Sequence, residues 1–240
     1  MRAGDRPFTC PGLGDRIHSV WLAHLYRGKS DDVTIHVTDD KWSIAGGVPS
    51  DKKPKSWREI IDLFPKGIHI QNHKVENLVE EEWIEYLKDK GFDAETYYYS
   101  DSLQMHPNDY EIGIDASQLL TEFGVIPPTK KVTKMPKYFT YNFDSTDASR
   151  SISPLLQTGL INKQTFTGLY PVEITGDMSL QDAGALIANA EYHIGIDSGI
   201  MHLARLYKEY EDIVLYTKPN GYRSHHLLRA VRNGSKEYVI

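Results

Sequence analysis

The sequence predicts an α/β protein made of two small Rossmann-like domains, and three observations lead to this fold class. Segments typical of strands and segments typical of helices alternate along the chain, as they do in parallel sheets covered by helices. The length of 240 residues lies between one and two average domains. Residues 127–136 are rich in proline and lysine, which disfavours both helix and buried strand. We therefore predict an N-terminal domain over residues 1–128 and a C-terminal domain over residues 129–240.

Local patterns indicate the elements of the N-terminal half. Residues 32–38 alternate apolar and polar side chains, as a half-buried strand does. Ser56 and Glu59 form a capping box in front of an apolar helical run. The acidic run near residues 76–90 is typical of the solvated face of a helix. In chain order we expect strand 8–10, helix 17–26, strand 32–38, helix 57–64, strand 68–70, helix 76–90, strand 95–99 and helix 115–123.

The C-terminal half continues the same alternation. A turn of small and polar residues, 197–199, joins one of its strands to a helix. In parallel sheets ligands bind at the carboxyl ends of the strands, and between two such domains they bind in the cleft. In chain order we expect strand 138–143, a polar loop over 144–153, strand 172–175, helix 180–189, strand 192–196, helix 200–207, strand 213–216 and a basic C-terminal helix.

Composition and charge exclude several classes of protein. Hydrophobic residues make up 40% of the chain and charged residues 25%, so it is not collagen-like, coiled-coil or wholly disordered. The net charge of −6 argues against a protein that coats nucleic acid non-specifically. The single cysteine, Cys10, suits a reducing compartment, and we interpret it as a small apolar residue. The chain lacks an apolar run of roughly 18 residues and an N-terminal secretion signal, so we expect a cytoplasmic protein without membrane insertion.

The sharpest local pattern surrounds the turn Asp197-Ser198-Gly199. A strand leads into this turn and a helix follows it, so Asp197 and Ser198 are candidate caps and the first N–H groups of the helix face outward. Such groups favour a phosphate, and Gly199 carries no Cβ that would block its approach. The imidazole of His202, in the first helical turn, could donate to the same phosphate oxygens. The alternative is an ordinary helix cap beside a packed histidine.

A second turn, Gly12-Leu13-Gly14-Asp15, opens the first helix of the N-terminal half. It is not a dinucleotide-binding fingerprint, because Ile17 stands where the third glycine is expected. A carboxylate at such a turn, facing an interdomain cleft, could accept a proton from a substrate hydroxyl. The alternative is that Asp15 only caps the helix.

Together the two turns resemble glycosyltransferase family 9, whose best-known members are the ADP-heptose:lipopolysaccharide heptosyltransferases. That family shows a GxGD turn near its N-terminus, often followed by an apolar residue and His, and a D-[ST]-G-x-x-H-[LI]-A turn in its C-terminal half. The run 178–190 also resembles the helix that precedes the second turn in the family. In this chain the two turns read Gly12-Leu13-Gly14-Asp15 with His18, and Asp197-Ser198-Gly199-Ile200-Met201-His202-Leu203-Ala204. Because the chain is shorter than typical members, we interpret it as a compact, divergent member of a kind that a virus could carry.

The resemblance implies a GT-B fold, in which two Rossmann-like domains face each other across a cleft. It also implies inverting transfer without a metal or cofactor, with a nucleoside-diphosphate sugar as co-substrate held mainly by the C-terminal domain. Asp15 would be the general base, in a loop shaped by Gly12 and Gly14. The donor diphosphate would be held by Asp197, Ser198, Gly199 and His202, with Arg150 as the candidate cation. The sequence has no Asp-x-Asp triplet, which agrees with a leaving diphosphate stabilised by N–H groups and cationic side chains.

A basic segment near the C-terminus suggests where an acceptor could bind. Residues 213–236 contain no Asp or Glu, and Arg223 and Arg229 of this segment join His18 as candidate acceptor-binding residues. The acceptor would be a carbohydrate or a hydroxymethylated base in phage DNA, which would have to be flipped out or single-stranded. The alternative is an exposed helix whose basic residues suit its dipole.

The sequence thus predicts an inverting, metal-independent glycosyltransferase that moves a sugar from a nucleoside diphosphate to a hydroxyl acceptor, in the host cytoplasm if the protein is viral. Two other functions stay open. One is a non-catalytic nucleotide-binding module that kept the phosphate turn, and the other is a sugar-nucleotide epimerase with the GT-B fold.

Overall fold

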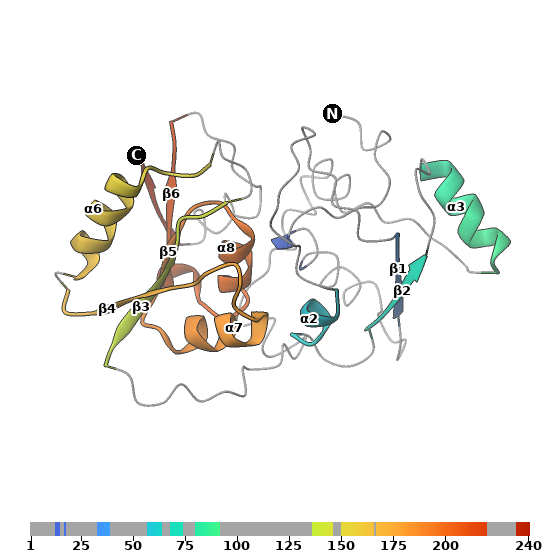
Figure 1. The fold of residues 1–240 in the computed structure, drawn as a ribbon, viewed down its shortest axis with the longest axis horizontal. Coiled ribbons are helices and arrows are strands. Elements are labelled where there is room, and N and C mark those ends of the chain that lie inside the picture. The colour runs from blue at the N-terminus through green and yellow to red at the C-terminus, as the bar shows by residue number, and fades with distance from the viewer. Residues whose placement is uncertain are drawn as a thin grey trace.

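The computed structural model describes parts of both halves of the chain (Figure 1). In the N-terminal half the described pieces are short, whereas the C-terminal half is described almost throughout. The described residues are 13, 14, 17, 33–38, 57–63, 68–73, 80–91, 136–145, 150–165, 167–219 and 234–240.

A five-stranded sheet forms the centre of the C-terminal half, and all of its strand pairs are parallel. The strands lie in the order β4-β3-β5-β6-β7. The chain therefore moves from β3 to one side and then returns past it to the other side, which makes the edge between β3 and β5 the switch point of the sheet. The strands are β3 (Tyr138–Asn142), β4 (Tyr170–Glu173), β5 (His193–Gly195), β6 (Ile213–Thr217) and β7 (Lys236–Val239).

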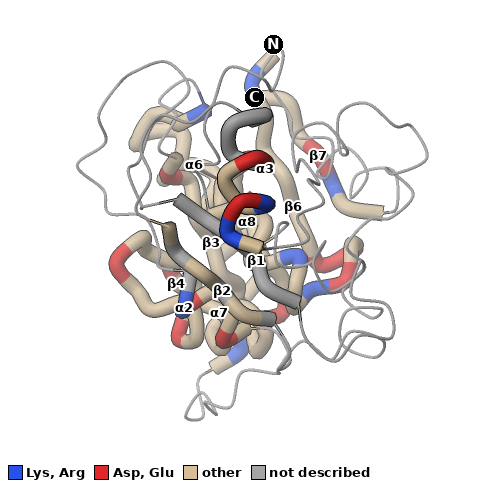
Figure 2. The backbone as a smooth tube through the Cα atoms, turned by 90° about the vertical axis from the view of Figure 1, so that its right-hand side faces the viewer, with Lys and Arg blue, Asp and Glu red and all other residues tan. Residues whose placement is uncertain are grey.

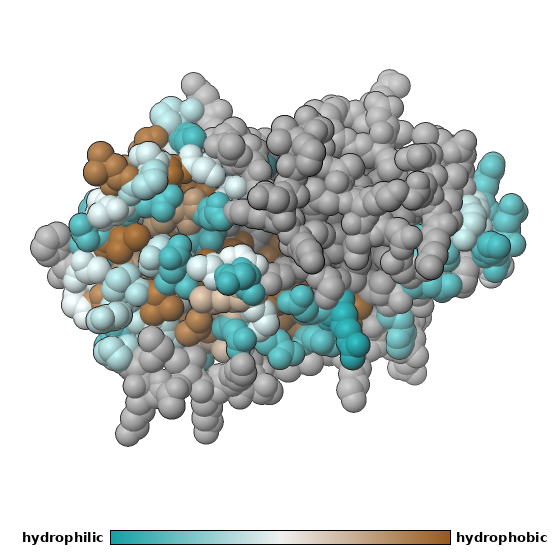
Figure 3. All heavy atoms as spheres, viewed as in Figure 1, coloured by the Kyte–Doolittle hydropathy of each residue, from teal (hydrophilic) through white to brown (hydrophobic). Residues whose placement is uncertain are grey.

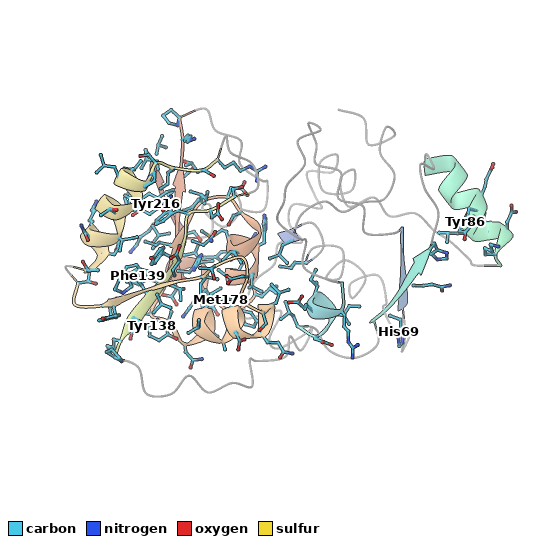
Figure 4. All side chains as sticks on the ribbon, viewed as in Figure 1. His69, Tyr86, Tyr138, Phe139, Met178 and Tyr216 are labelled. Atoms are coloured by element: carbon cyan, nitrogen blue, oxygen red, sulfur yellow. The ribbon has the colours of Figure 1, made fainter. Side chains whose placement is uncertain are left out.

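Helices cover both faces of this sheet (Figure 1). Helix α6 (Pro154–Thr165) packs on one face, where Leu160 joins a core that includes Phe139 and Tyr216 (Figure 4). Helices α7 (Leu180–Asn189) and α8 (Gly199–Ala204) pack on the other face. The alternation along β3 explains this division, because Phe139 joins the α6 core while the hydroxyl of Tyr138 donates to the Leu186 carbonyl of α7 at 2.9 Å.

The described part of the N-terminal half contains a parallel pair of strands, β1 (Val33–Thr38) and β2 (Ile68–His73). Helix α2 (Trp57–Ile61) lies between them in the sequence, as in a β-α-β unit. Helix α3 (Glu80–Asp89) follows, and its acidic and basic positions stand out in Figure 2. Within α3 Leu87 is buried while Glu85 and Lys88 are exposed, which fits the predicted solvated face.

Most of the predicted elements that fall on described residues are confirmed. The α/β class and a parallel sheet are correct, and α7 has the predicted bounds. Strand β2 extends to His73, beyond the predicted 68–70. Helix α3 ends at Asp89, close to the predicted end at residue 90, and residues 76–79 of the predicted helix lie outside the described part. Of the predicted helix 17–26 only Ile17 is described, and it is helical. Strands 8–10 and 95–99, and helix 115–123, lie outside the described residues.

Two parts of the C-terminal half differ from the prediction. No helix was predicted over 154–165, where α6 forms, because the apolar residues of this segment follow no helical period. In the structure its Leu155 is 85% exposed. Figure 3 shows the hydrophobic residues of the surface in brown. The prediction that a basic helix ends the chain is wrong for residues 236–239, which form β7 because they pair with β6. Residues 220–233 of that predicted helix lie outside the described part. The two-domain GT-B arrangement and the boundary after residue 128 stay predictions.

None of the helices in the described segments combines the length and the apolar character that crossing a membrane would need.

Candidate functional site

The parallel strands β3 and β5 end at the same edge of the sheet. Strand β3 ends at Asn142 and β5 at Gly195, and the two strands are neighbours. The chain leaves them in opposite directions along the sheet. In α/β proteins, ligands bind outside the carboxyl ends of the strands at such a switch point. The turn Asp197-Ser198-Gly199 lies at this edge.

Ser198 caps the helix that follows the turn. Its backbone is extended, with φ −148° and ψ 167°, and its Oγ accepts a hydrogen bond from the Met201 backbone N–H at 3.4 Å. Helix α8 begins at Gly199, as the pattern of small and polar residues predicted. The N–H groups of Gly199 and Ile200 are the two helical donors ahead of Met201, and the first N–H groups of a helix have no acceptor within it.

Asn142 holds the same serine from the side of the sheet. The Ser198 hydroxyl donates to Asn142 Oδ1 at 3.2 Å, and Asn142 Nδ2 donates to the Ile174 backbone carbonyl at 2.9 Å. The sequence analysis did not single out Asn142. The available signal was a polar residue at the end of an aromatic strand, Tyr138-Phe139-Thr140-Tyr141-Asn142.

Asp197 is the acidic centre of a small charged cluster. Its side chain is only 3% exposed, and the Arg150 Nη1 atom lies 3.3 Å from its Oδ1. The same nitrogen donates to the Asp197 backbone carbonyl at 3.4 Å. His202 Nε2 lies 3.8 Å from the same Oδ1. The structure therefore brings Arg150, which is 47 residues away in sequence, to the turn together with His202.

This arrangement determines what Asp197 can do. A carboxylate so deeply buried requires charged or polar partners, and here Arg150 supplies a guanidinium and His202 a ring nitrogen. A second anion would be repelled by the carboxylate itself and attracted by the Arg150 guanidinium beside it. Asp197 thus orients Arg150 and His202, which both lie near its Oδ1.

Leu13 and Gly14, which were predicted to lie in a turn, are helical in the structure, and they lie against helix α8. A Cβ built on Gly14 would lie 2.5 Å from Cδ2 of His202, and a Cβ built on Gly199 would lie 2.6 Å from Cβ of Leu13. Both distances are shorter than real Cβ contacts, so the two glycines allow these segments to approach. Residues 13–14 of the first sequence motif therefore contact residues 199 and 202 of the second.

A second contact joins the two halves of the chain. Helices α2 and α7 touch one another, and they lie side by side in Figure 1. The Leu180 backbone N–H, at the first position of α7, donates to Glu59 Oε2 at 3.5 Å. Glu59, which was predicted to complete a capping box in the N-terminal half, therefore contacts the start of a helix in the C-terminal half.

A buried histidine lies in strand β5, next to the site. His193 is fully buried, and its Nδ1 is 3.0 Å from Thr140 Oγ1. Burial lowers the pKa of His193 to about 3, and the nearby Lys208 adds to the effect. His193 is therefore neutral at physiological pH, and its role is to join β5 to β3.

The outcome for the predicted site residues is as follows. Gly14, Arg150, Asp197, Ser198, Gly199 and His202 are described and lie together in the contacts given above. Five others lie outside the described residues: Gly12, Asp15, His18, Arg223 and Arg229. In the described segments no group of three His, Cys, Asp or Glu side chains is arranged to hold a metal ion.

Comparison with known proteins agrees with the resemblance in the motifs. No curated protein and no solved structure matches the chain. A family model does match, over a segment that runs from α6 through the site turn and α8 to the end of β6. Residues 155–220 of this chain match the model of glycosyltransferase family 9 (heptosyltransferase).

Proposed function

We propose that this protein is a glycosyltransferase that moves a sugar from a nucleoside-diphosphate donor to a hydroxyl group of an acceptor. The family match over residues 155–220 supports this proposal, because it includes the turn 197–199 and helix α8. The observation that carries it is the cluster of Arg150, Asp197 and His202 at the switch point of the sheet. It places an arginine and a histidine side chain where α/β folds hold ligands.

The donor diphosphate binds beside this cluster in the proposed mechanism. Arg150 and His202 face its oxygens from their positions next to Asp197, and the Gly199 N–H donates from the start of α8. As the bond from the anomeric carbon to the diphosphate breaks, its electron pair passes to the diphosphate. Preformed donors that face this growing charge lower the barrier, and they do so without a metal ion.

The acceptor hydroxyl attacks the anomeric carbon from the face opposite the diphosphate, so the configuration inverts. Its oxygen forms the new glycosidic bond, and its proton passes to the Asp15 carboxylate. Two observations support Asp15 in this role: it follows Gly14 directly in the sequence, and Gly14 lies against His202. A base in this position would be close to the donor site.

The acceptor class is a carbohydrate or a hydroxymethylated DNA base. His18, Arg223 and Arg229 are the residues proposed to bind it, since a basic surface suits a phosphate-bearing acceptor. We further propose that the reaction takes place in the cytoplasm, that of the host if the protein is viral.

The purified protein should be incubated with a panel of UDP-, ADP- and GDP-sugars, alone and with carbohydrate or hydroxymethylated DNA acceptors. Slow hydrolysis of one donor, and transfer to one acceptor class with inversion, would support the proposal. A new sugar isomer would identify an epimerase instead. Binding without turnover would identify a nucleotide-binding module, and either result would overturn the transferase proposal.

A further inference from the structure

We infer that Asn142 is a positioning residue for the donor site, and this inference rests on the proposed function. Asn142 fixes the direction of the Ser198 hydroxyl and thereby holds Asp197, with its partners Arg150 and His202, in one place. Its role is to position other groups, because the hydrogen bonds of its side chain go to the Ile174 carbonyl after β4 and to the Ser198 hydroxyl after β5.

The direction of each hydrogen bond at Asn142 follows from one group that can only accept. The Ile174 backbone carbonyl accepts at 2.9 Å, so the part of the Asn142 amide that faces it must be the NH2 group. Oδ1 then faces Ser198, so the serine hydroxyl must donate to it at 3.2 Å. The lone pairs of that hydroxyl are left to accept from the Met201 N–H.

The single proton of the Ser198 hydroxyl is therefore donated within the protein. The hydroxyl donates this proton to Asn142 Oδ1, and one lone pair of its oxygen accepts from the Met201 N–H of α8. The contribution of Ser198 to donor binding is to hold the turn, and its side chain does not donate to the diphosphate.

Asn142 also holds the residue on the other side of Asp197. Its backbone carbonyl accepts the Ile196 N–H at 3.4 Å, while its side chain accepts from Ser198. Asp197 lies between these two anchored residues. Since Arg150 and His202 are both oriented toward Asp197 Oδ1, a shift of this carboxylate moves both side chains.

Burial makes this arrangement costly to lose. Asn142 is 5% exposed and Ser198 is 6% exposed, so solvent water cannot readily replace the missing bond. In Asn142→Ala the serine hydroxyl loses its acceptor and the turn loses its connection to β3. The predicted result is a weaker affinity for a nucleoside diphosphate, about tenfold in Kd.

The experiment measures the Kd of ADP, UDP and GDP by calorimetry for the wild-type protein and for matched variants. Asn142→Ala and Ser198→Ala should each raise the Kd about tenfold. The double variant should show little further loss, because both changes remove the same bond. Ser198→Thr, which keeps the hydroxyl, should restore binding to near the wild-type value.

Gln164→Ala is the matched control. Gln164 also makes two side-chain hydrogen bonds within the same half, to the hydroxyls of Tyr216 and Tyr192, but it does so from α6 on the opposite face of the sheet. This variant should lower the melting temperature and leave the Kd unchanged. A loss of affinity as large as that of Asn142→Ala would mean that general loosening, and not positioning, explains the effect.

The outcomes separate this inference from the proposed function. If the wild-type protein binds none of the three nucleoside diphosphates, both fall. If it binds one of them and both alanine variants bind equally well, only the inference falls. The inference also falls if the losses in the double variant add up, and Ser198→Ala tests it even if Asn142→Ala does not fold.

Discussion

At the scale of single residues, the site depends on charges that are removed from water. Asp197 is buried, and its partners are Arg150 from the loop after β3 and His202 from α8. The ion pair with Arg150 adds little to stability by itself, but the loss of Arg150 leaves a buried charge uncompensated. The same two side chains are proposed to face the donor. Stability and ligand binding should therefore change together when Arg150 is removed.

Arg150→Ala should lower the free energy of unfolding by about 2 kcal/mol, because Asp197 loses its nearest cation. Affinity for a nucleoside diphosphate should fall as well. Urea unfolding and calorimetric titration measure the two effects. Lys137→Ala is the control, since Lys137 pairs with Glu191 at an exposed site where ion pairs contribute little. Equal stability losses in the two variants would contradict the role of Arg150.

His193 should make the protein sensitive to mild acid. Its pKa is about 3 in the folded protein and 6.5 when exposed, so the unfolded chain binds a proton first as the pH falls. The stabilisation from neutral His193 is complete above pH 6.5 and is lost as the pH falls toward 3. The loss approaches about 1.4 kcal/mol per pH unit from this one group.

Urea unfolding between pH 7.5 and pH 5 tests this dependence. His193→Asn keeps a polar side chain near Thr140 but does not titrate, so the pH slope of stability should be smaller in this variant than in the wild-type protein. Identical slopes would show that His193 does not contribute.

At the scale of elements, local sequence was sufficient where a helix carries both its cap and its apolar face. Helix α7 has the bounds that were predicted, and the structure shows a local reason: the Ser179 side chain accepts from the Asp182 N–H, and the buried residues of the helix lie on one side. Helix α6 lacks that period and was not predicted, and β7 needs β6 beside it. Asn142 was not identified because its partners, Ile174 and Ser198, are 32 and 56 residues away.

Two glycines within helices should respond in opposite ways to alanine. Gly159 in α6 has open space where a Cβ would be, so Gly159→Ala should stabilise the protein by about 0.5–1 kcal/mol. A Cβ on Gly184 in α7 would lie 2.8 Å from the Tyr207 ring, so Gly184→Ala should destabilise it. Denaturant midpoints compare the two directly. Stabilisation by both substitutions would contradict the close packing of α7 on Tyr207.

At the scale of the whole molecule, the account depends on two turns from opposite halves of the chain. The motifs predicted that both belong to one site, and the structure brings Leu13 and Gly14 against Gly199 and His202. The sequence could not predict these contacts from local patterns, because nothing near Gly14 indicates which helix it will meet. The resemblance to a family supplied that expectation, and the segment that matches the family model, residues 155–220, includes the C-terminal turn.

Asp15→Asn tests whether Asp15 accepts the proton while the C-terminal turn binds the donor. The amide keeps the size of the side chain but cannot accept the acceptor proton, so turnover should fall by about 10²–10⁴-fold. Donor binding should stay close to the wild-type value, since the donor is proposed to be held by the C-terminal turn. Transfer assays and calorimetric titration provide the two numbers. Unchanged turnover would remove Asp15 from the mechanism.

The most direct test of the central claim is a calorimetric titration of the wild-type protein and of His202→Ala with ADP, UDP and GDP. If the turn at residues 197–199 holds the donor diphosphate, the wild-type protein binds at least one of the three, and His202→Ala binds it more weakly because the imidazole beside Asp197 is missing. An affinity that is unaltered in His202→Ala, or a wild-type protein that binds none of the three, would contradict the claim.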